Sequence, residues 1–162
     1  MRLAGASYDE LYGSFRWEVP ARFNIAAAIC DRHAAATPDA PALIHEAGGG
    51  SVNTWSFARI KEAADRLAHA LATLGVGRGA IVAIHLSQCP ENLITHVAAH
   101  KLGAIAMPLF ALFGPDAVRF RLEDSGAKVL VTAADSIERV AEGLTDIPTL
   151  RHIISIDGPG PL

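Results

Sequence analysis

A chain of 162 residues, of which 51% are apolar and 19% are charged, is suited to one globular domain with a sizeable core, and its composition argues against disorder. The formal charge of -3 and the 14 scattered lysines and arginines leave no basic stripe for a phosphate backbone, so no nucleic acid partner is expected. Because Cys30 and Cys89 are isolated, no apolar run reaches membrane-spanning length and no secretory signal is recognisable, we expect a cytoplasmic protein with reduced thiols and no membrane span.

The first part of the chain predicts an arm, a helix and a hairpin. Residues 1–22 have no clear hydrophobic period and are interpreted as an N-terminal arm that lies over a surface. Asn24 is a candidate N-cap of a helix that stops before Thr37-Pro38, because a residue that precedes proline disfavours helical geometry. The two short strand-like runs on either side of glycines 48–50 then indicate a hairpin.

The most regular segment predicts a helix over residues 57–74. Ser56 can cap its start, and Gly75 can end it in the left-handed conformation that glycine tolerates. Its apolar residues recur every three or four positions, which predicts a stripe that packs on a sheet. The stripe consists of Phe57, Ile60, Ala64, Leu67, Leu71 and Leu74.

Strand-like and helical segments alternate from residue 80 onward. The expected strands are 80–86, 104–110, 127–133 and 151–156, and the expected helices are Pro90 to Gly103, Pro115 to about Glu123, and 136–144 with Asp135 as its cap. Alternation of this kind is typical of βαβ units, so the predicted fold class is α/β with a mainly parallel sheet flanked by helices over residues 23–157. Pro108 indicates a strand end or edge, and residues 158–162 are interpreted as a linker or a truncated end.

Little of the chain suggests chemistry by itself. Parallel sheets bind ligands at the carboxyl ends of their strands, so a site is expected in the loops after Leu86, Phe110 and Ala133. The glycines at 75–79 follow a helix and precede a strand, which is the reverse of a dinucleotide fingerprint, and the chain contains neither GxxxxGK[ST] nor GxSxG. From these patterns we assign no catalytic residue and no metal ligand.

Two further patterns have a functional and a structural interpretation. The loop before the Pro90 helix contains Cys89 and could receive an anion or activate a thiolate, but ordinary helix capping also explains it. His96 and His100 have the i, i+4 spacing of a zinc pair, although Val97 stands where the HExxH motif has its glutamate. We interpret both patterns as structural.

Taken together, three segments resemble a known family. These segments are FNIAAAICDRHAAATPDAPALI, TWSFARIKEAADRLAHALATLGVGRGAIVAIHLSQCPENLITHVAAHKLGA and LFGPDAVRFRLEDSGAKVLVT. In order and spacing they resemble the N-terminal part of the AMP-forming acyl-CoA synthetases of the adenylate-forming superfamily, nearest to the acetyl-CoA and medium-chain acyl-CoA synthetase branch. The resemblance extends from about Trp17 to Ile156 and implies the N-terminal part of such an enzyme's large domain.

The resemblance implies an enzyme that uses ATP and Mg²⁺ to activate a small carboxylic acid as an acyl-adenylate and then transfers the acyl group to coenzyme A. Enzymes of this family include those that activate the acids of fatty acid metabolism. The family's phosphate loop and catalytic lysine would lie downstream, so the chain is expected to be an inactive fragment that binds no cofactor tightly and partners the remainder of the protein. A homo-oligomer stays open. The alternative is a stand-alone, non-catalytic nucleotide-binding or interaction module.

The same resemblance assigns the only candidate binding residues. In acetyl-CoA synthetases the loop that corresponds to Phe110, Ala111 and Leu112, and an arginine near Arg139, border the coenzyme A nucleotide. Here Ala111-Leu112 replaces the family's pair of glycines, which allow close approach of a ligand to the backbone. Without the resemblance, Arg139 reads as a solvated charge on the polar face of its helix.

Overall fold

The computed structural model describes residues 7–158, so nearly all of the predicted linker at 158–162 lies outside the described residues. Within this range no helix is both long enough and apolar enough to cross a membrane. The elements in chain order are α1 (Tyr8–Ser14), η1 (Ala27–Asp31), α2 (Arg32–Ala36), β1 (Pro41–Glu46), β2 (Val52–Ser56), α3 (Phe57–Thr73), β3 (Ile81–His85), α4 (Pro90–Lys101), β4 (Ile105–Pro108), α5 (Pro115–Ser125), β5 (Val129–Thr132), α6 (Ala134–Leu144) and β6 (His152–Ser155).

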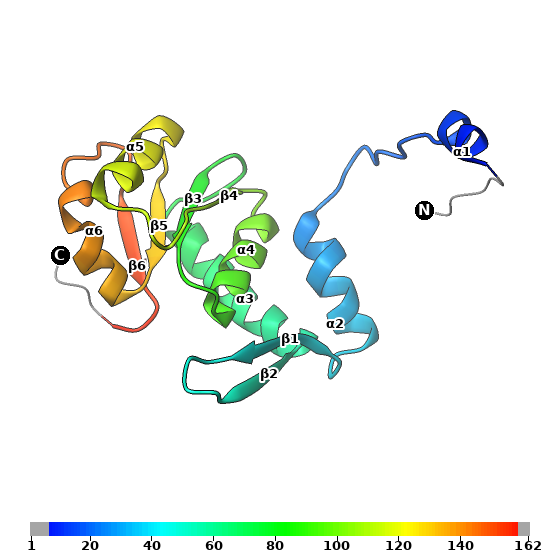
Figure 1. Ribbon diagram of the computed structural model, residues 1–162, viewed down its shortest axis with the longest axis horizontal. Helices are drawn as coiled ribbons and strands as arrows, with labels where there is room; N and C mark the ends of the chain where they lie inside the picture. The colour runs from blue at the N-terminus through cyan, green and yellow to red at the C-terminus, as the bar shows by residue number, and fades with distance from the viewer. Residues whose placement is uncertain (1–6, 159–162) are drawn as a thin grey trace.

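The centre of the molecule is a four-stranded parallel sheet (Figure 1). Its strand order is β4-β3-β5-β6, so β3 lies inside the sheet although it is the first of these strands in the chain. β4 lies at an edge, as Pro108 indicates, because an edge position requires fewer backbone donors. The predicted α/β fold with a mainly parallel sheet is therefore confirmed.

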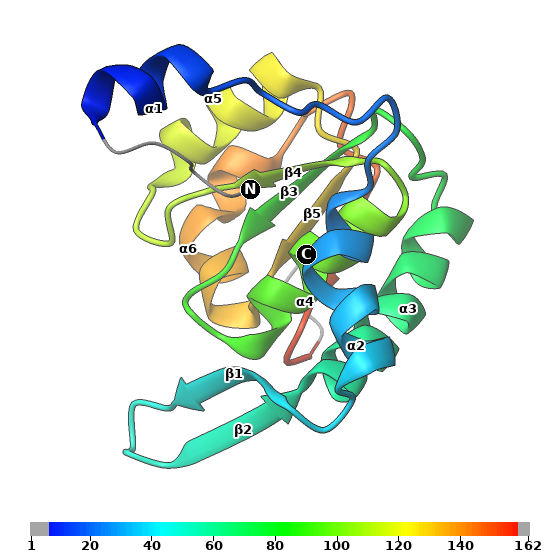
Figure 2. The same cartoon turned by 90° about the vertical axis from the view of Figure 1, so that its right-hand side faces the viewer.

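Helices cover both faces of this sheet (Figure 2). On one face α3 and α4 pack on the strands, and the buried stripe of α3 contains Ile60, Ala64, Ala68 and Leu71. On the other face α5 and α6 pack on the strands through side chains that include Val118, Leu122 and Val140. This two-faced burial explains why the strands read as continuous apolar runs.

The caps around α3 form as expected. Ser56 Oγ accepts a hydrogen bond from the Arg59 N–H at 3.3 Å, and Gly75 has a φ of 79° after the last turn. Asn24 also caps as predicted, since its Oδ1 accepts from the Ala27 N–H at 3.1 Å. Its side-chain amide additionally donates to the His100 carbonyl at 2.9 Å, so that one side chain joins the start of the helix that contains η1 and α2 to the end of α4. The helix that follows Asn24 has π-helical turns (η1), which the sequence did not indicate.

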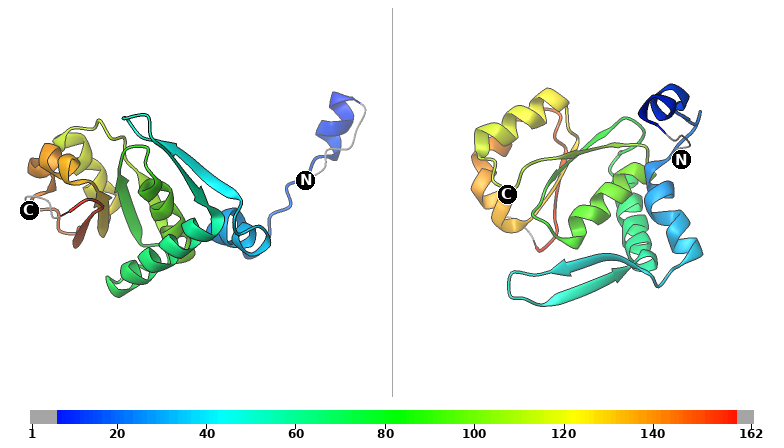
Figure 3. Two further views of the ribbon diagram at one scale, coloured as in Figure 1. Left: turned by 90° about the horizontal axis from the view of Figure 1, so that it is seen from below. Right: turned by 45° about the vertical axis from the view of Figure 1, so that its right-hand side comes forward.

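The antiparallel pair β1 and β2 confirms the predicted hairpin, which projects from the α/β body (Figure 3).

Lys101 of α4 connects three helices through ion pairs. Its Nζ contacts the carboxylate of Asp31 on η1 and lies 2.9 Å from Asp65 Oδ1 on α3. Burial alone would lower the pKa of Lys101, but the two carboxylates outweigh it and raise this pKa, so the lysine stays charged.

The N-terminal arm contains a short helix that the hydrophobic pattern of the sequence did not indicate. Where an irregular arm was expected, the chain forms the short helix α1, whose cap Ser7 accepts from the Glu10 N–H at 3.3 Å. None of the α1 residues is buried, and Tyr8 is 75% exposed. Figures 1 and 3 show α1 standing away from the α/β body, so the described part of the arm does not lie over a surface of that body.

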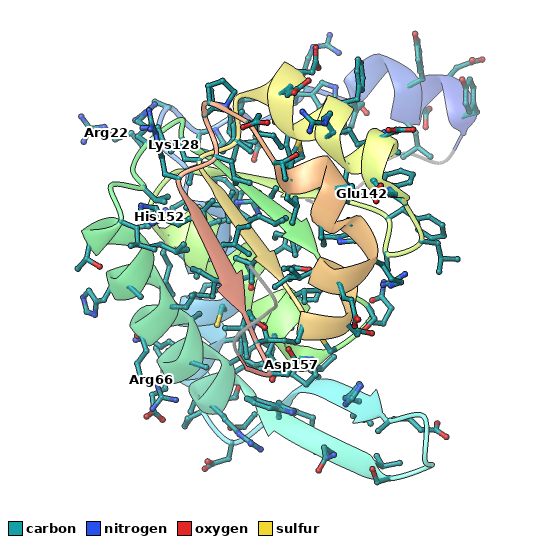
Figure 4. All side chains as sticks on the ribbon, turned by 90° about the vertical axis from the view of Figure 1, so that its left-hand side faces the viewer. Arg22, Arg66, Lys128, Glu142, His152 and Asp157 are labelled. Atoms are coloured by element: carbon teal, nitrogen blue, oxygen red, sulfur yellow. The ribbon has the colours of Figure 1, made fainter. Side chains whose placement is uncertain are left out.

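The predicted cap of α6 is also wrong. Asp135 lies inside the first turn, and Ala133 occupies the N-cap position without a side-chain hydrogen bond. Asp157, which follows β6, supplies the cap because its Oδ1 accepts from the Ala134 N–H at 2.8 Å. This bond, with a second from the Ser155 hydroxyl, lowers the pKa of the Asp157 carboxyl. Figure 4 shows Asp157 at the carboxyl end of β6, whereas Lys128 and His152 lie toward the other end of the sheet.

Candidate functional site

The strand order creates a topological switch point between β3 and β5. From β3 the chain continues through α4 to β4 on one side, whereas from β5 it continues through α6 to β6 on the other side and the opposite face. Ligands of open α/β sheets bind at the carboxyl ends of the strands beside such a point. Here those ends are His85 and Thr132, which are paired in register, and the buried Thr132 hydroxyl donates to the His85 carbonyl at 3.0 Å.

The loop after β4 reaches this point because of the topology. β4 lies beside β3 on the edge, but α5 packs on the face that α6 also covers, so residues 109–114 must cross over the carboxyl end of the sheet. The crossing begins with the Leu109 N–H, which donates to the Ile84 carbonyl at 2.8 Å. The loop that contains Phe110, Ala111 and Leu112 therefore lies next to the first turns of α6.

The structure brings two of the predicted site residues into contact. Arg139, an exposed residue of α6, donates from Nη1 to the Ala111 carbonyl at 3.2 Å and from Nη2 to Ser136 Oγ at 2.8 Å. Phe110 and Leu112 do not join this network; they are 62% and 75% exposed and present apolar surface beside it. A cation and an apolar platform thus lie together at the carboxyl edge of the sheet.

Sequence reasoning missed His85 and Ser136. Ser136 is 5% exposed, and its hydroxyl donates to Asp135 Oδ1 at 3.3 Å while it accepts from Arg139, so it holds the guanidinium in place. His85 is fully buried at the end of β3. Its only signal in the sequence is a single ionisable residue that interrupts an apolar strand, immediately before a loop at which a site is expected.

The surroundings of His85 favour its neutral form. Burial lowers the pKa of His85, and the Arg139 guanidinium lowers it further. The main-chain groups of Phe110 and Ala111 and the Asp135 carboxylate offset this effect only in part. At neutral pH the imidazole is therefore uncharged, with one N–H donor and one acceptor nitrogen.

The two remaining sequence patterns, Cys89 and the pair of His96 and His100, belong to the start and the body of α4. Cys89 is the N-cap residue of α4, and burial raises the pKa of its thiol, which opposes a reactive thiolate and supports the structural interpretation. The rings of His96 and His100 are 6.1 Å apart. His96 also borders a cavity of about 600 Å³, which the β3 loop and Phe110 line as well. In the described range no group of three or more His, Cys, Asp and Glu side chains could hold a metal ion.

Similar proteins are larger than this chain. Acetyl-coenzyme A synthetase 2 of Zygosaccharomyces bailii is 33% identical over 158 residues, which cover 91% of this chain and 23% of that protein. Acetyl-coenzyme A synthetase of Sodalis glossinidius (strain morsitans) is 32% identical over 132 residues, which cover 81% of this chain and 20% of that protein. The chain thus spans about a fifth to a quarter of these relatives.

Two solved structures have the same fold. A Brucella canis acyl-CoA synthetase superposes with a TM-score of 0.75 at 28% identity, with 86% of this chain and 25% of that chain covered. An anthranilate CoA ligase in complex with anthranoyl-AMP superposes with a TM-score of 0.77 at 25% identity, with 86% and 26% covered. The sequence model of the AMP-binding enzyme family matches residues 30–162, and we conclude that the chain belongs to this family.

Proposed function

We propose that this chain is the N-terminal segment of an AMP-forming acyl-CoA ligase and that it contributes to the binding of coenzyme A. The complete protein would activate a small carboxylic acid with ATP and Mg²⁺ as an acyl-adenylate and would then transfer the acyl group to coenzyme A in the cytoplasm. The similarity to synthetases and ligases of acyl-CoA along most of the chain supports this proposal.

The observation that carries the binding role is the contact between Arg139 and the Ala111 carbonyl. It places a guanidinium, which suits phosphate groups, beside the exposed side chains of Phe110 and Leu112, which offer apolar surface to an adenine ring. A nucleotide with phosphates, such as coenzyme A, combines both requirements. The described residues take no part in the adenylation chemistry in this proposal.

Replacement of Arg139 by alanine in the complete enzyme should affect only the second half-reaction. Loss of a charge-assisted phosphate contact is expected to raise KM for coenzyme A about tenfold, which corresponds to about 1.4 kcal/mol. The rate of acyl-adenylate formation should stay within about twofold of the wild-type rate, because adenylation precedes coenzyme A binding in this scheme. Both rates are measured by ATP-pyrophosphate exchange and by thioester formation at varied coenzyme A.

Arg66→Ala is the matched control for this experiment, because Arg66 is an exposed arginine of α3 that pairs only with Glu62 among the described residues (Figure 4). This substitution removes one positive charge at a position outside the candidate site, so KM for coenzyme A should be unchanged. An equal loss of both half-reactions in Arg139→Ala would indicate a folding defect, and no loss in either would leave Arg139 a solvated charge.

The chain alone should not catalyse adenylation. It contains no GxxxxGK[ST] loop to hold a triphosphate, and it spans only about a fifth to a quarter of the synthetases to which it is similar. ATP-pyrophosphate exchange that depends on added carboxylate should therefore stay at background for the purified 162-residue chain. Exchange above background in a preparation free of host synthetases would contradict this assignment.

A further inference from the structure

His85 is the one buried side chain of the described residues whose polar atoms have no hydrogen-bond partner. Its exposure is 0%, and neither Nδ1 nor Nε2 makes a hydrogen bond. Buried polar groups are nearly always paired, and an unpaired one is costly. An isolated exception at the carboxyl end of a strand, beside the candidate site, therefore requires an explanation.

The position of His85 in β3 determines which face its ring occupies. Ile81 and Ala83 belong to the core beneath α5 and α6, and side chains two residues apart in a strand point to the same face. The His85 ring therefore lies on the α5 and α6 side of the sheet, beneath the crossing loop and the first turns of α6. The Thr132 hydroxyl on the neighbouring strand donates to the His85 main-chain carbonyl and makes no hydrogen bond to the ring.

The polar and charged groups that act on the His85 ring come from two elements. The loop after β4 presents the main-chain groups of Phe110 and Ala111, and α6 presents the charges of Arg139 and Asp135. The main-chain groups influence the ring although neither makes a hydrogen bond of acceptable geometry with it in this conformation. The Ala111 carbonyl is occupied, since it accepts from Arg139 Nη1 at 3.2 Å.

Both terminal nitrogens of Arg139 already donate a hydrogen bond within the protein, so a guanidinium that presents its two-pronged edge to a phosphate group has to turn. The guanidinium is held inward by the Ala111 carbonyl and by Ser136 Oγ. A guanidinium that turns outward to a phosphate group gives up the Ala111 contact and leaves that carbonyl without a donor. The neutral imidazole of His85 lies beside this carbonyl and has an unused N–H.

We propose that His85 is a positioning residue, which donates its ring N–H to the Ala111 carbonyl when Arg139 leaves that carbonyl to bind a phosphate group of coenzyme A. The exchange keeps the loop of Phe110, Ala111 and Leu112 in place while the arginine moves. It also accounts for the unpaired ring in the conformation in which Arg139 donates to the Ala111 carbonyl. This inference rests on the proposed role of Arg139 in coenzyme A binding.

The test compares His85→Phe and His85→Gln in the complete enzyme with coenzyme A as the varied substrate. Phenylalanine fills the volume but has no donor, so KM for coenzyme A should rise about fivefold, which corresponds to one hydrogen bond of about 1 kcal/mol. Glutamine retains an N–H donor and should restore KM to within about twofold of the wild-type value. Adenylation, measured by ATP-pyrophosphate exchange, should be unchanged in both variants.

Two further variants separate positioning from packing. Thr132→Val removes the hydrogen bond to the His85 main chain but leaves the ring unchanged, so it should lower the melting temperature without changing KM for coenzyme A. In the Arg139→Ala background, His85→Phe should have no further effect on KM, because no arginine then leaves the Ala111 carbonyl. A full fivefold effect in that background would overturn the proposal.

The outcomes also distinguish this inference from the proposed function. If Arg139→Ala raises KM for coenzyme A and His85→Phe does not, the role of His85 is wrong and the role of Arg139 stands. If neither variant raises KM, both roles are wrong. If His85→Phe lowers both half-reactions equally and glutamine restores neither, His85 is only a packing residue. Should His85→Phe fail to fold, a fivefold rise in KM for His85→Gln would equally overturn the proposal.

Discussion

Replacement of Leu71 by alanine should lower the free energy of unfolding of this chain by about 2 to 5 kcal/mol, as truncation of a buried leucine does. Leu71 is 0% exposed and is the last buried residue on the face that α3 packs on the sheet. Its neighbours in the same core include Val82, Ile84 and Val131 of the strands and Val97 of α4. Strands on one side and a helix on the other hold these neighbours, so they can collapse only partly into the cavity.

The change is measured by urea denaturation of the wild-type and variant chains, with Leu112→Ala as the matched control. Leu112 is 75% exposed, so the same truncation there should change the free energy of unfolding by less than about 0.5 kcal/mol. Equal effects for both variants would mean that the apolar stripe of α3 does not face the sheet. That result would contradict the arrangement of layers on which the site depends.

Replacement of Gly143 by alanine should destabilise the chain by about 1 to 3 kcal/mol, although alanine is intrinsically the better helix former. A Cβ at Gly143 would lie 2.3 Å from the Pro115 carbonyl oxygen, where α6 crosses the first turn of α5. The contact is with main chain, so it can be relieved only by separating the two helices. Both helices contribute to the core beneath the crossing loop, so this separation would disturb the loop as well.

The control for this prediction is Gly77→Ala. A Cβ at Gly77 would meet no atom within 4 Å, and this glycine does not have a positive φ, so the substitution should change stability by less than about 0.5 kcal/mol. Both variants are compared by thermal and urea denaturation. A stabilising effect of Gly143→Ala would show that α5 and α6 do not approach as closely as described.

Elements with strong local patterns were predictable from the sequence. The stripe of α3, the caps at Ser56 and Gly75, and the alternation after residue 80 follow from periodicity and capping chemistry alone, and all appear in the structure. The short helix α1 had a usable signal in Ser7 followed by Asp9 and Glu10, but it buries nothing, so no hydrophobic period revealed it. The π-helical turns of η1 have no comparable signal.

Features that depend on distant residues were not predictable. The cap of α6 comes from Asp157, 23 residues after the N–H that it accepts, whereas the local pattern favoured Asp135. The contact of Arg139 with Ala111 spans 28 residues and depends on the strand order, which carries the β4 loop over the sheet. The family resemblance suggested both residues as site residues, but only the strand order explains why they are in contact. The same strand order puts His85 beneath them.

Comparison of two thiol substrates in the complete enzyme is the most direct test of the claim that this segment binds the phosphates of coenzyme A. Coenzyme A carries phosphates and an adenine, whereas pantetheine carries the thiol without them. Arg139→Ala should lower kcat/KM about tenfold for coenzyme A and leave kcat/KM for pantetheine unchanged. An equal loss for both thiols would contradict it, because the arginine would then act on something other than the phosphates.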